Sequence, residues 1–315
     1  MSYVKSMPVF GRVDGVESDV LRVHQVVQYI DLDTEVPAPK SICFLSFAND
    51  EGVRRNQGRI GAAGGSLAIR QAMASMPVHF DDEFRLYDCG VIRQDDQDLE
   101  KHQERLAHYV AKILNAGGLP VVLGGGHDIT YGNYCGIRRH YKKEKIGIIN
   151  FDAHLDFRPV EVGVGNSSGT SVWKIAHDAK ENNDYFACLG VGIQKYGNTK
   201  KLFNLAKEFG VDYISGDEFC PENKHKILHK IQKFIDENDY IYFTICMDGF
   251  SASHAPGVSA PSLNGIIPDA TFRAVFDAIA QSGKMISIDF AETNPLYDID
   301  NRTSKLAASM IFRLF

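Results

Sequence analysis

The sequence predicts an α/β fold of three layers, with helices on both faces of a mostly parallel central sheet. Short apolar, β-branched runs alternate along the chain with longer stretches of helical periodicity. Such alternation is typical of parallel sheets that helices cover on both sides. No linker-like composition interrupts the series from residue 36 to residue 315, so we expect a single domain there. For the preceding segment, residues 1–35, the sequence leaves the packing open.

The predicted elements follow from local composition and from hydrophobic spacing. Six runs have the apolar, β-branched character of buried strands, namely residues 41–46, 119–123, 145–151, 186–190, 240–247 and 285–290. Five stretches show helical periodicity instead, namely residues 98–116, 129–141, 200–209, 224–237 and 268–281. Because ligands of open α/β sheets sit at the carboxyl ends of the strands, these ends are the places to search for a site.

The bulk properties narrow the class of protein. With 315 residues, 44% of them apolar, the chain can bury a sizeable core, and its net charge of −6 without a basic stripe argues against nucleic-acid binding. No apolar run reaches the roughly 18 residues that a membrane span needs, and the first residues lack a signal-peptide core. The six cysteines have no paired spacing, which indicates reduced thiols and a cytoplasmic protein.

Chemically active side chains follow four of the predicted strands. Asp152, His154 and Asp156 come directly after the 145–151 run. If the backbone stays extended there, all three point the same way, because alternate residues of a strand share a face. Three further strand ends carry comparable residues: His127 behind a run of three glycines, then Cys246 with Asp248, and finally Glu292.

This set of residue types points to metal ions. Carboxylates and imidazoles together suit Mn, Fe or Zn, and a pair of ions about 3.5–4 Å apart can activate a shared water. Two simpler readings compete: a charged loop with a chance histidine between two acids, and a phosphate-cradling glycine loop at Gly124–Gly126. The absence of a following Lys-Ser/Thr pair disfavours the phosphate loop.

At this point the chain resembles the ureohydrolase family, the group of arginases, agmatinases and formimidoylglutamases. The matching segments are Gly125-Gly126-His127-Asp128, Phe151-Asp152-Ala153-His154-Leu155-Asp156, Met247-Asp248 with the loop 255–261, and Glu292-Thr293-Asn294-Pro295. The resemblance spans roughly residues 40 to 315. It implies an arginase-like α/β/α fold, a catalytic domain over residues 36–315, and a binuclear manganese centre whose bridging hydroxide attacks an amidine or guanidine carbon.

Within the family, three segments are most similar to formimidoylglutamases, which hydrolyse N-formimidoyl-L-glutamate to L-glutamate and formamide in histidine degradation. They are residues 49–59, 166–170 and 255–261. A substrate with two carboxylates needs local positive charge, and arginine suits bidentate carboxylate contacts. The candidate substrate-binding residues are therefore Arg54, Arg55 and Arg59, with Asn166 and Ser168 placed near the substrate by resemblance. A basic surface loop is the alternative for each arginine.

The resemblance also implies the roles of the strand-end residues. One ion would be held by His127, Asp152, Asp156 and Cys246, and the other by Asp152, His154, Cys246 and Asp248. Asp156 would also relay a proton, and Glu292 would pair with the cationic amidine group. An acid that caps a helix or lies at the core edge is the alternative for Glu292.

Two positions depart from the family pattern. Cys246 stands where the family has its first aspartate in S-x-D-x-D, if the segment is aligned by counting back from Pro256. A rival alignment would put Asp248 first and Phe250 second. A thiolate ligand would favour Zn or Fe over Mn, whereas a buried apolar cysteine is the alternative. Ser168 stands where arginases carry a proton-transferring histidine, which argues against arginase activity.

Three functional hypotheses remain open on the sequence. The first is a formimidoylglutamase with two Mn²⁺ ions per chain, acting on a small formimidoylated amino acid. The second keeps the fold but changes the substrate to agmatine or another guanidino acid. The third is a metal-poor, inactive relative that acts as a binding protein. The family resemblance further suggests a homo-oligomer, without nucleic-acid or membrane partners.

Overall fold

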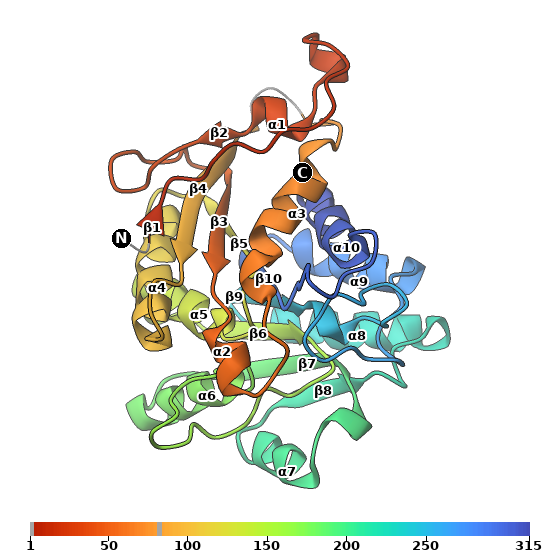
Figure 1. Cartoon of the computed structure of the whole chain (residues 1–315). Coiled ribbons are helices and arrows are strands. Elements are labelled where there is room, and N and C mark those ends of the chain that lie inside the picture. The colour runs from red at the N-terminus through yellow and green to blue at the C-terminus, as the bar shows by residue number, and fades with distance from the viewer. Residues whose placement is uncertain (1–2, 81–83) are drawn as a thin grey trace.

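The computed structural model describes residues 3–80 and 84–315, and within them one twisted sheet forms the middle layer of the molecule (Figure 1). Its strands are β1 (Tyr3–Val4), β2 (Gln28–Tyr29), β3 (Ile42–Ala48), β4 (Leu86–Arg93), β5 (Leu119–Leu123), β6 (Ile146–Phe151), β7 (Ala187–Ile193), β8 (Asp212–Ser215), β9 (Tyr240–Cys246) and β10 (Met285–Ala291). The order is β1-β4-β3-β5-β10-β9-β6-β7-β8, and β2 pairs with β4. Only β1 pairs antiparallel with its neighbour, so the predicted mostly parallel sheet is confirmed for the described residues.

Helices cover the sheet on both sides. They are α1 (Val23–Val26), α2 (Glu51–Arg55), α3 (Gly65–Ala74), α4 (Leu99–Asn115), α5 (Ile129–His140), α6 (Ser171–Asn182), α7 (Lys200–Glu208), α8 (Lys224–Asp236), α9 (Ala270–Ala280) and α10 (Arg302–Ile311). Helices α3, α8, α9 and α10 pack into one apolar core, and α4, α5, α6 and α7 pack into a second core. The two cores lie on opposite faces of the sheet, which gives the three layers that the sequence predicts.

The strands contribute to both cores by alternation. In β3, Phe44 lies in the core with α3, whereas Cys43 and Leu45 lie in the core with α4. In β9, Phe243 lies in the core with α3, and Tyr242 lies in the core with α4. Because successive side chains of a strand point to opposite faces, a strand buried on both sides must be apolar throughout. This is why the predicted strands appear as continuous apolar runs.

Every predicted strand and helix is present in the structure within a few residues of its expected bounds. The helix ends follow capping rules: the side chain of Asp98 accepts from the N–H of Lys101 at the start of α4, and that of Asp269 accepts from Thr271 and Phe272 at the start of α9. The sequence analysis did not identify β1, β2, β4 and β8, nor helices α1, α2, α3, α6 and α10.

The N-terminal segment joins the sheet. Tyr3 and Val4 pair with Ile92 and Val91 of β4, and the Tyr3 hydroxyl donates to the carbonyl of Cys89. The expected boundary between residues 35 and 36 stays a prediction.

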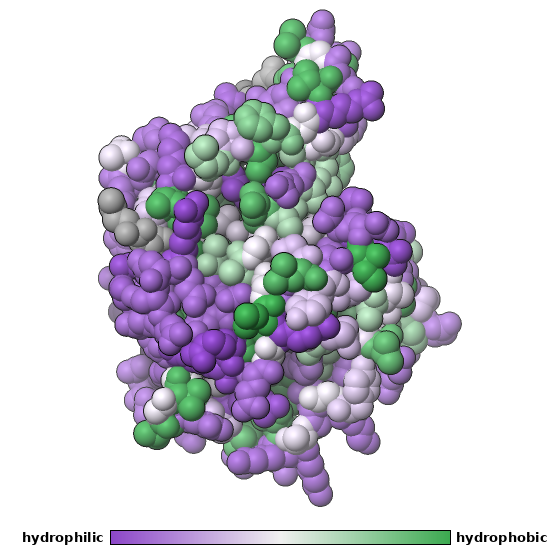
Figure 2. Space-filling model, in the orientation of Figure 1, coloured by the Kyte–Doolittle hydropathy of each residue, from purple (hydrophilic) through white to green (hydrophobic). Residues whose placement is uncertain are grey.

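On the face shown in Figure 2, hydrophilic side chains predominate and apolar ones gather in small separate groups. Among the described residues, no helix combines the length and apolar character of a membrane span.

Candidate metal centre

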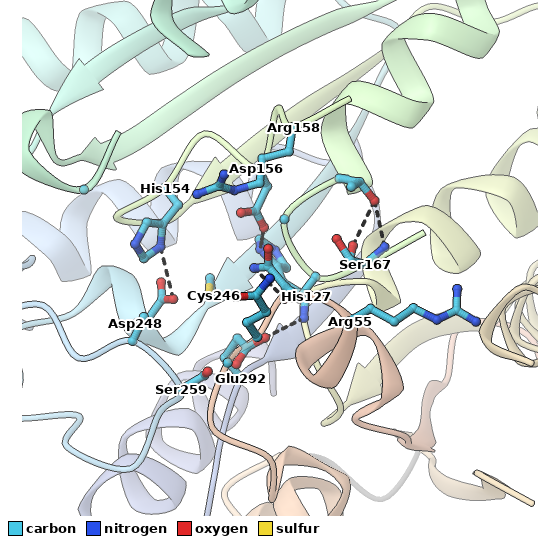
Figure 3. Close-up of a pocket in the computed structure, with 18 of the residues that line it drawn as sticks. Arg55, His127, His154, Asp156, Arg158, Ser167, Cys246, Asp248, Ser259 and Glu292 are labelled. Atoms are coloured by element: carbon cyan, nitrogen blue, oxygen red, sulfur yellow. Dashed lines mark hydrogen bonds and ion pairs between the residues drawn. The ribbon is translucent and has the colours of Figure 1, made fainter. Parts of the chain in front are cut away.

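The strand order explains why distant parts of the sequence meet at one site. Strands β5, β10, β9 and β6 are consecutive neighbours in the sheet, although their sequence order is different. All four run parallel, so their carboxyl ends lie along one edge. The residues that follow them come together there, as the parallel-sheet rule predicts. We call this set the acidic cluster: His127, Asp152, His154, Asp156, Cys246, Asp248 and Glu292. Figure 3 labels all of them except Asp152.

The first part of the acidic cluster centres on His127. Its Nδ1 lies 2.7 Å from Asp156 Oδ2 and 3.0 Å from Asp152 Oδ2. One ligand atom each of His127, Asp152 and Cys246 lie within 4.8 Å of one another, and all three side chains are buried. An imidazole, a carboxylate and a thiol at such spacing form a group that can hold a divalent cation.

The second part centres on His154. Its Nδ1 lies 3.2 Å from Asp248 Oδ2 and 3.4 Å from Asp152 Oδ1. Ligand atoms of Asp152, His154 and Asp248 also lie within 4.8 Å of one another. Asp152 therefore belongs to both groups, with one oxygen facing each histidine.

The charges of the acidic cluster are poorly balanced by protein groups alone. Burial, together with the charge of Asp248, raises the pKa of Glu292 to about 8, and burial with the charge of Asp152 raises the pKa of Asp156 to about 6. Burial and the charge of Asp152 also raise the pKa of Asp248. Asp248 Oδ1 and Glu292 Oε2 are buried and have no hydrogen-bond partner among the described residues. Unsatisfied, crowded carboxylates of this kind fit bound cations.

The histidines respond in the opposite direction. Burial by itself lowers the pKa of His127, but its contacts with Asp152 and Asp156 outweigh burial and raise the pKa well above its ordinary value. In the same way, burial lowers the pKa of His154, but its contacts with Asp248 and Asp152 together outweigh burial and raise the pKa to about 12. In the absence of cations, two imidazolium groups therefore partly neutralise the carboxylates.

Two members of the cluster have strained backbones. Asp156 and Glu292 adopt positive φ angles of 47° and 65°, a region that residues other than glycine rarely occupy. Each follows the end of a strand and turns its side chain into the site. Such conformations persist only when the surrounding structure holds them, and they concentrate at functional sites.

Glycine residues bring the His127 loop close to its neighbours. Gly124 and Gly125 have φ angles of 79° and 82°. An added Cβ would lie 2.4 Å from the backbone nitrogen of Ser66 at position 124, and 2.7 Å from the carbonyl oxygen of Phe47 at position 125. The loop is thus a close-packed support for His127, and the backbone N–H of His127 donates to Glu292 Oε1 at 3.0 Å.

Cys246 is the last residue of β9, is buried, and lines the same cavity as His127 and Asp248. Burial, followed by the surrounding carboxylates, raises the pKa of its thiol well above the ordinary value. The rival alignment fails in this structure, because Phe250 packs in the apolar core, 5.1 Å from the ring of Phe272. Cys246 as a metal ligand stays a prediction, with its side chain placed where a ligand is needed.

A buried polar network supports the outer side of the His127 ring. His127 Nε2 lies 2.9 Å from the hydroxyl of Thr244, which donates to Asp289 Oδ1 at 2.6 Å. The hydroxyl of Tyr242 and the amide of Asn133 donate to the other oxygen of Asp289. Because one ring nitrogen is held from behind, Nδ1 is directed toward Asp152 and Asp156. Sequence analysis missed this network, whose only signal is polar residues at alternate positions of an otherwise apolar strand.

Comparisons with known proteins agree with this geometry. The model of the arginase family matches residues 40–315, which is most of the chain. The chain belongs to the arginase family. It is accordingly a hydrolase that acts on a C–N bond, and its arrangement is the arginase-like fold.

Several arginase-family relatives can be compared over nearly the whole length. The chain is 40% identical over 316 residues to a formimidoylglutamase of Fusobacterium nucleatum, covering 96% of each chain. It is 43% identical over 307 residues to one of Nocardia farcinica, covering 96% of this chain and 94% of the relative. Among solved structures, the formimidoylglutamase of Bacillus subtilis is similar, with a TM-score of 0.81 and 23% identity. The match covers 97% of this chain and 95% of the B. subtilis chain. The formiminoglutamase of Trypanosoma cruzi with Mn²⁺ gives a TM-score of 0.77, 24% identity, and coverage of 88% and 92%.

In this arginase-family chain the acidic cluster opens into a cavity of about 570 Å³. The loops after β6 and before α3 form its wall, including the expected substrate-binding residues Arg55, Arg59 and Ser168. Arg54 and Asn166 are not among the lining residues within the described parts of the chain. Ser168 is buried and accepts a hydrogen bond from Asn56, and Asn166 donates to Gln103 at 2.7 Å.

The three predicted arginines are already paired inside the protein. Arg54 donates to Glu51 at 2.7 Å and its side chain is 53% exposed. Arg55 donates to Glu51 and Glu100, and in Figure 3 its side chain points away from the acidic cluster. Arg59 donates to the carbonyls of loop residues 258 and 259 and stacks on a tyrosine ring at 4.2 Å.

Arg158 is the arginine that sequence analysis missed. It follows Asp156 by two residues, lines the cavity, and is exposed. Its backbone N–H donates to the carbonyl of Gly169, but its guanidinium has no hydrogen bond or ion pair with any described residue. The extended backbone expected after residue 151 is wrong, because residues 153 and 154 form a bend and Asp156 is left-handed. The signal that could have identified Arg158 is a basic residue placed directly after the ligand segment.

Proposed function

We propose that this chain hydrolyses N-formimidoyl-L-glutamate to L-glutamate and formamide, a step of histidine degradation. The observation that carries the proposal is one cavity that combines the acidic cluster with the unpaired guanidinium of Arg158. The substrate has the complementary charges: an amidine that becomes cationic and two carboxylates. Identities of about 40% over almost the whole length to relatives named formimidoylglutamase support the same substrate.

The acidic cluster fits two divalent cations, which we propose to be Mn²⁺. His127, Asp152, Asp156 and Cys246 would hold one, and His154, Asp152, Cys246 and Asp248 the other. When bound, such a pair lowers the pKa of a shared water and supplies a nucleophile near neutral pH. The T. cruzi structure that contains Mn²⁺ supports the choice of metal, and the Cys246 thiol makes Zn and Fe the alternatives.

The chain's own acids would bind and orient the amidine. Glu292 Oε1 is held by the His127 N–H, and Oε2 has no partner, so this oxygen is available to accept from an amidinium N–H. The positive charge of a bound amidinium would also lower the raised pKa of Glu292. The substrate complex would then contain a charge-assisted pair between the amidinium and the Glu292 carboxylate. Asp156 has its Oδ2 on His127 and lines the cavity, so its Oδ1 can accept a proton from the attacking water and return it to the leaving nitrogen.

Positive charge at the cavity wall would hold the two substrate carboxylates. Arg158 can form a bidentate contact, because its guanidinium is not committed to any described acid. Arg59 and Ser168 also line the wall and would contribute further donors. Arg54, Arg55 and Asn166 would act less directly, since their polar groups are bonded to other parts of the chain.

A panel of substrates tests the proposal. Purified, Mn²⁺-loaded protein is assayed on N-formimidoyl-L-glutamate, arginine, agmatine and guanidinobutyrate. We expect turnover of the first compound and much weaker or no turnover of the others. Turnover of arginine or agmatine alone would contradict the proposal and favour another guanidino substrate.

A second candidate function follows from Cys246. A thiol at a position that bridges two ions in the family pattern favours a metal-poor, inactive relative, because a protonated buried thiol is a poor ligand. Metal content separates the two candidates. Less than one metal per chain after reconstitution under reducing conditions would favour the inactive relative.

The remaining expectations concern the setting of the enzyme. All six cysteines are free, which supports the proposed cytoplasmic location, where thiols stay reduced. The family resemblance supports a homo-oligomer, and the oligomeric state can be measured by light scattering on the metal-loaded protein.

A further inference from the structure

The loop that carries Asp152, His154 and Asp156 continues beyond the end of β6 without a strand beside it. The regular ladder with β7 ends at the pair Phe151–Val191, followed by one more bond from the Asp152 N–H to the Val191 carbonyl. After Ile193 the neighbouring chain turns away into a short 3₁₀ helix, Lys195–Gly197. The backbone groups of residues 153 and 155 therefore need other partners, because buried N–H and C=O groups are rarely left unpaired.

Asn198 supplies those partners with its side chain. Its Oδ1 accepts from the N–H of Leu155 at 2.9 Å, and its Nδ2 donates to the carbonyl of Ala153, also at 2.9 Å. One carboxamide thus serves an acceptor and a donor two residues apart, as a peptide group of an adjacent strand would. The side chain of Asn198 is only 8% exposed, so these bonds lie in a largely water-free environment.

The loop that contains Asn198 is itself held in place. Asn198 Nδ2 also donates to the carbonyl of Gln194 at 2.7 Å, and the N–H of Gln194 donates to the carbonyl of Ala153 at 2.8 Å. The buried side chain of Gln194 donates to the carbonyl of Asn264 at 2.8 Å. The contact with Ala153 is therefore made by a braced loop, not by a free side chain.

The same loop also packs against one of the metal-ligand side chains. A Cβ added to Gly197 would lie 3.3 Å from Cδ2 and 3.4 Å from Nε2 of His154. This spacing leaves room for the imidazole and little more, so the loop limits where the ring can move. Residues 194–198 therefore contact both the backbone of the ligand segment and the imidazole ring of His154.

We infer that Asn198 is a positioning residue whose side chain takes the place of a neighbouring strand and so fixes the backbone of residues 153–155, with the ligand atoms of Asp152, His154 and Asp156 facing the metal site. The inference rests on the proposed metal-dependent function. Without the carboxamide, the Ala153 carbonyl loses one of its two donors and the Leu155 N–H loses its acceptor. The segment between Asp152 and Asp156 is then free to leave the conformation that directs its ligand atoms toward the site. Partners that orient metal ligands without touching the metal contribute about 10–100-fold to metal affinity.

The test compares Mn²⁺ binding by the full-length wild-type chain and its Asn198→Asp variant, measured by calorimetry on metal-free protein. Aspartate has nearly the same shape, but it places an acceptor against the carbonyls of Ala153 and Gln194. We expect about 10–100-fold weaker Mn²⁺ binding, a lower thermal midpoint of a metal-free chain that still unfolds cooperatively, because a largely buried carboxylate then faces two carbonyls, and recovery of activity in excess Mn²⁺. Asn223→Asp is the matched control, because its amide also donates to a backbone carbonyl, that of Glu218, in an exposed turn.

Gly197→Ala is the second variant, in case Asn198→Asp does not fold. It should weaken Mn²⁺ binding through the His154 ring while the fold is retained. Mn²⁺ affinity within twofold of wild type in Asn198→Asp, or an equal loss in Asn223→Asp, would overturn the inference. So would a Gly197→Ala chain with unchanged affinity if Asn198→Asp fails to fold. A wild-type chain that binds no Mn²⁺ would overturn the proposed function itself and this inference with it.

Discussion

The acidic cluster and the arginines near the cavity have opposite charges, and they differ most in whether the protein itself satisfies them. The cluster contains carboxylate oxygens of Asp248 and Glu292 that have no partner among the described residues, although both are buried. Arg54, Arg55 and Arg59 are in part exposed, yet each is bonded to an acid or a carbonyl of the chain. Arg158 is the exception among these four.

Charged groups without a protein partner indicate a ligand-binding site, whereas charged groups that are paired within the chain stabilise the loops. Burying a carboxylate without a partner is costly, so the cluster fits a bound cation better than an empty site. The pair of Arg55 with Glu100 instead joins α2 to α4, and a bond from Arg55 to the carbonyl of Asn166 adds the loop before α6. These contacts need no ligand. Residue type alone does not distinguish the two situations, whereas the partners do.

The largest expected effect comes from removing the thiol of the cluster. If Cys246 is a ligand, Cys246→Ala should lose both bound metal and activity, whereas Cys246→Asp should keep both, because a carboxylate replaces the thiolate. Metal content by elemental analysis and turnover are measured on the same samples. Metal retained by the alanine variant would refute the ligand role and leave Cys246 as a buried apolar side chain.

A smaller effect is expected at the unpaired arginine. Arg158→Ala should lower kcat/KM by about 10–100-fold, chiefly through KM, because a charge-assisted contact of about 1.5–3 kcal/mol is lost. Arg54→Ala is the matched control. Its guanidinium does not line the cavity, and the buried Glu51 keeps its pair with Arg55 in the variant, so steady-state kinetics should change by less than about twofold. Equal losses in the two variants would remove the distinction between paired and unpaired arginines.

The network behind His127 should have a more moderate effect. Thr244→Val removes the hydroxyl that contacts Nε2 and should weaken Mn²⁺ binding by about tenfold. Thr244→Ser retains the hydroxyl and should bind Mn²⁺ nearly as the wild type does. Calorimetric titration of metal-free protein measures both, and similar affinities for the two variants would show that the hydroxyl does not orient the ring.

The smallest effect is a dependence on pH. Metal binding requires deprotonated ligands. The pKa of the proposed ligand Asp156 is raised to about 6, and that of the neighbouring Glu292, whose negative charge would also favour a cation, is raised to about 8. Mn²⁺ affinity should therefore rise between pH 6 and 8. Over the same range the metal-free fold should lose stability, because a raised carboxyl pKa stabilises the fold only while the group is protonated. The raised pKa of His154 acts in the same direction, since its stabilising contribution is also lost as pH rises above its ordinary value.

Thermal unfolding of the metal-free chain and of its Glu292→Gln variant at several pH values checks the sign. The variant lacks one of the titrating groups and should show a shallower decline. Stability that rises from pH 6 to 8 in the metal-free wild type would contradict the raised pKa values.

Much of the fold could be predicted because each buried strand must be apolar on both faces. Strand β5 was expected at its observed bounds, and β9 within one residue. Strand β4 was missed because its apolar run contains Asp88 and Gly90; Asp88 is acceptable there only because Arg70 of α3 forms an ion pair with it. Strand β8 was missed because it is an edge of four residues, two of them exposed. Strand β4 therefore depends on a partner from a distant part of the sequence, and β8 depends on its place at the sheet edge. Neither has the continuous apolar run that marks a buried strand.

Sequence alone specifies which residue types stand at the ends of the buried strands, since a ligand must lie close after its strand to reach the edge of the sheet. His127, Asp152, His154, Asp248 and Glu292 could be identified in this way. The placement of β10 and β9 between β5 and β6, which brings these ends together, became known from the folded structure. The folded structure also shows which charges are satisfied: Glu100 reaches Arg55 from another helix, whereas no described acid reaches Arg158. Pairing of charges depends on contacts across the fold, and local sequence does not specify such contacts.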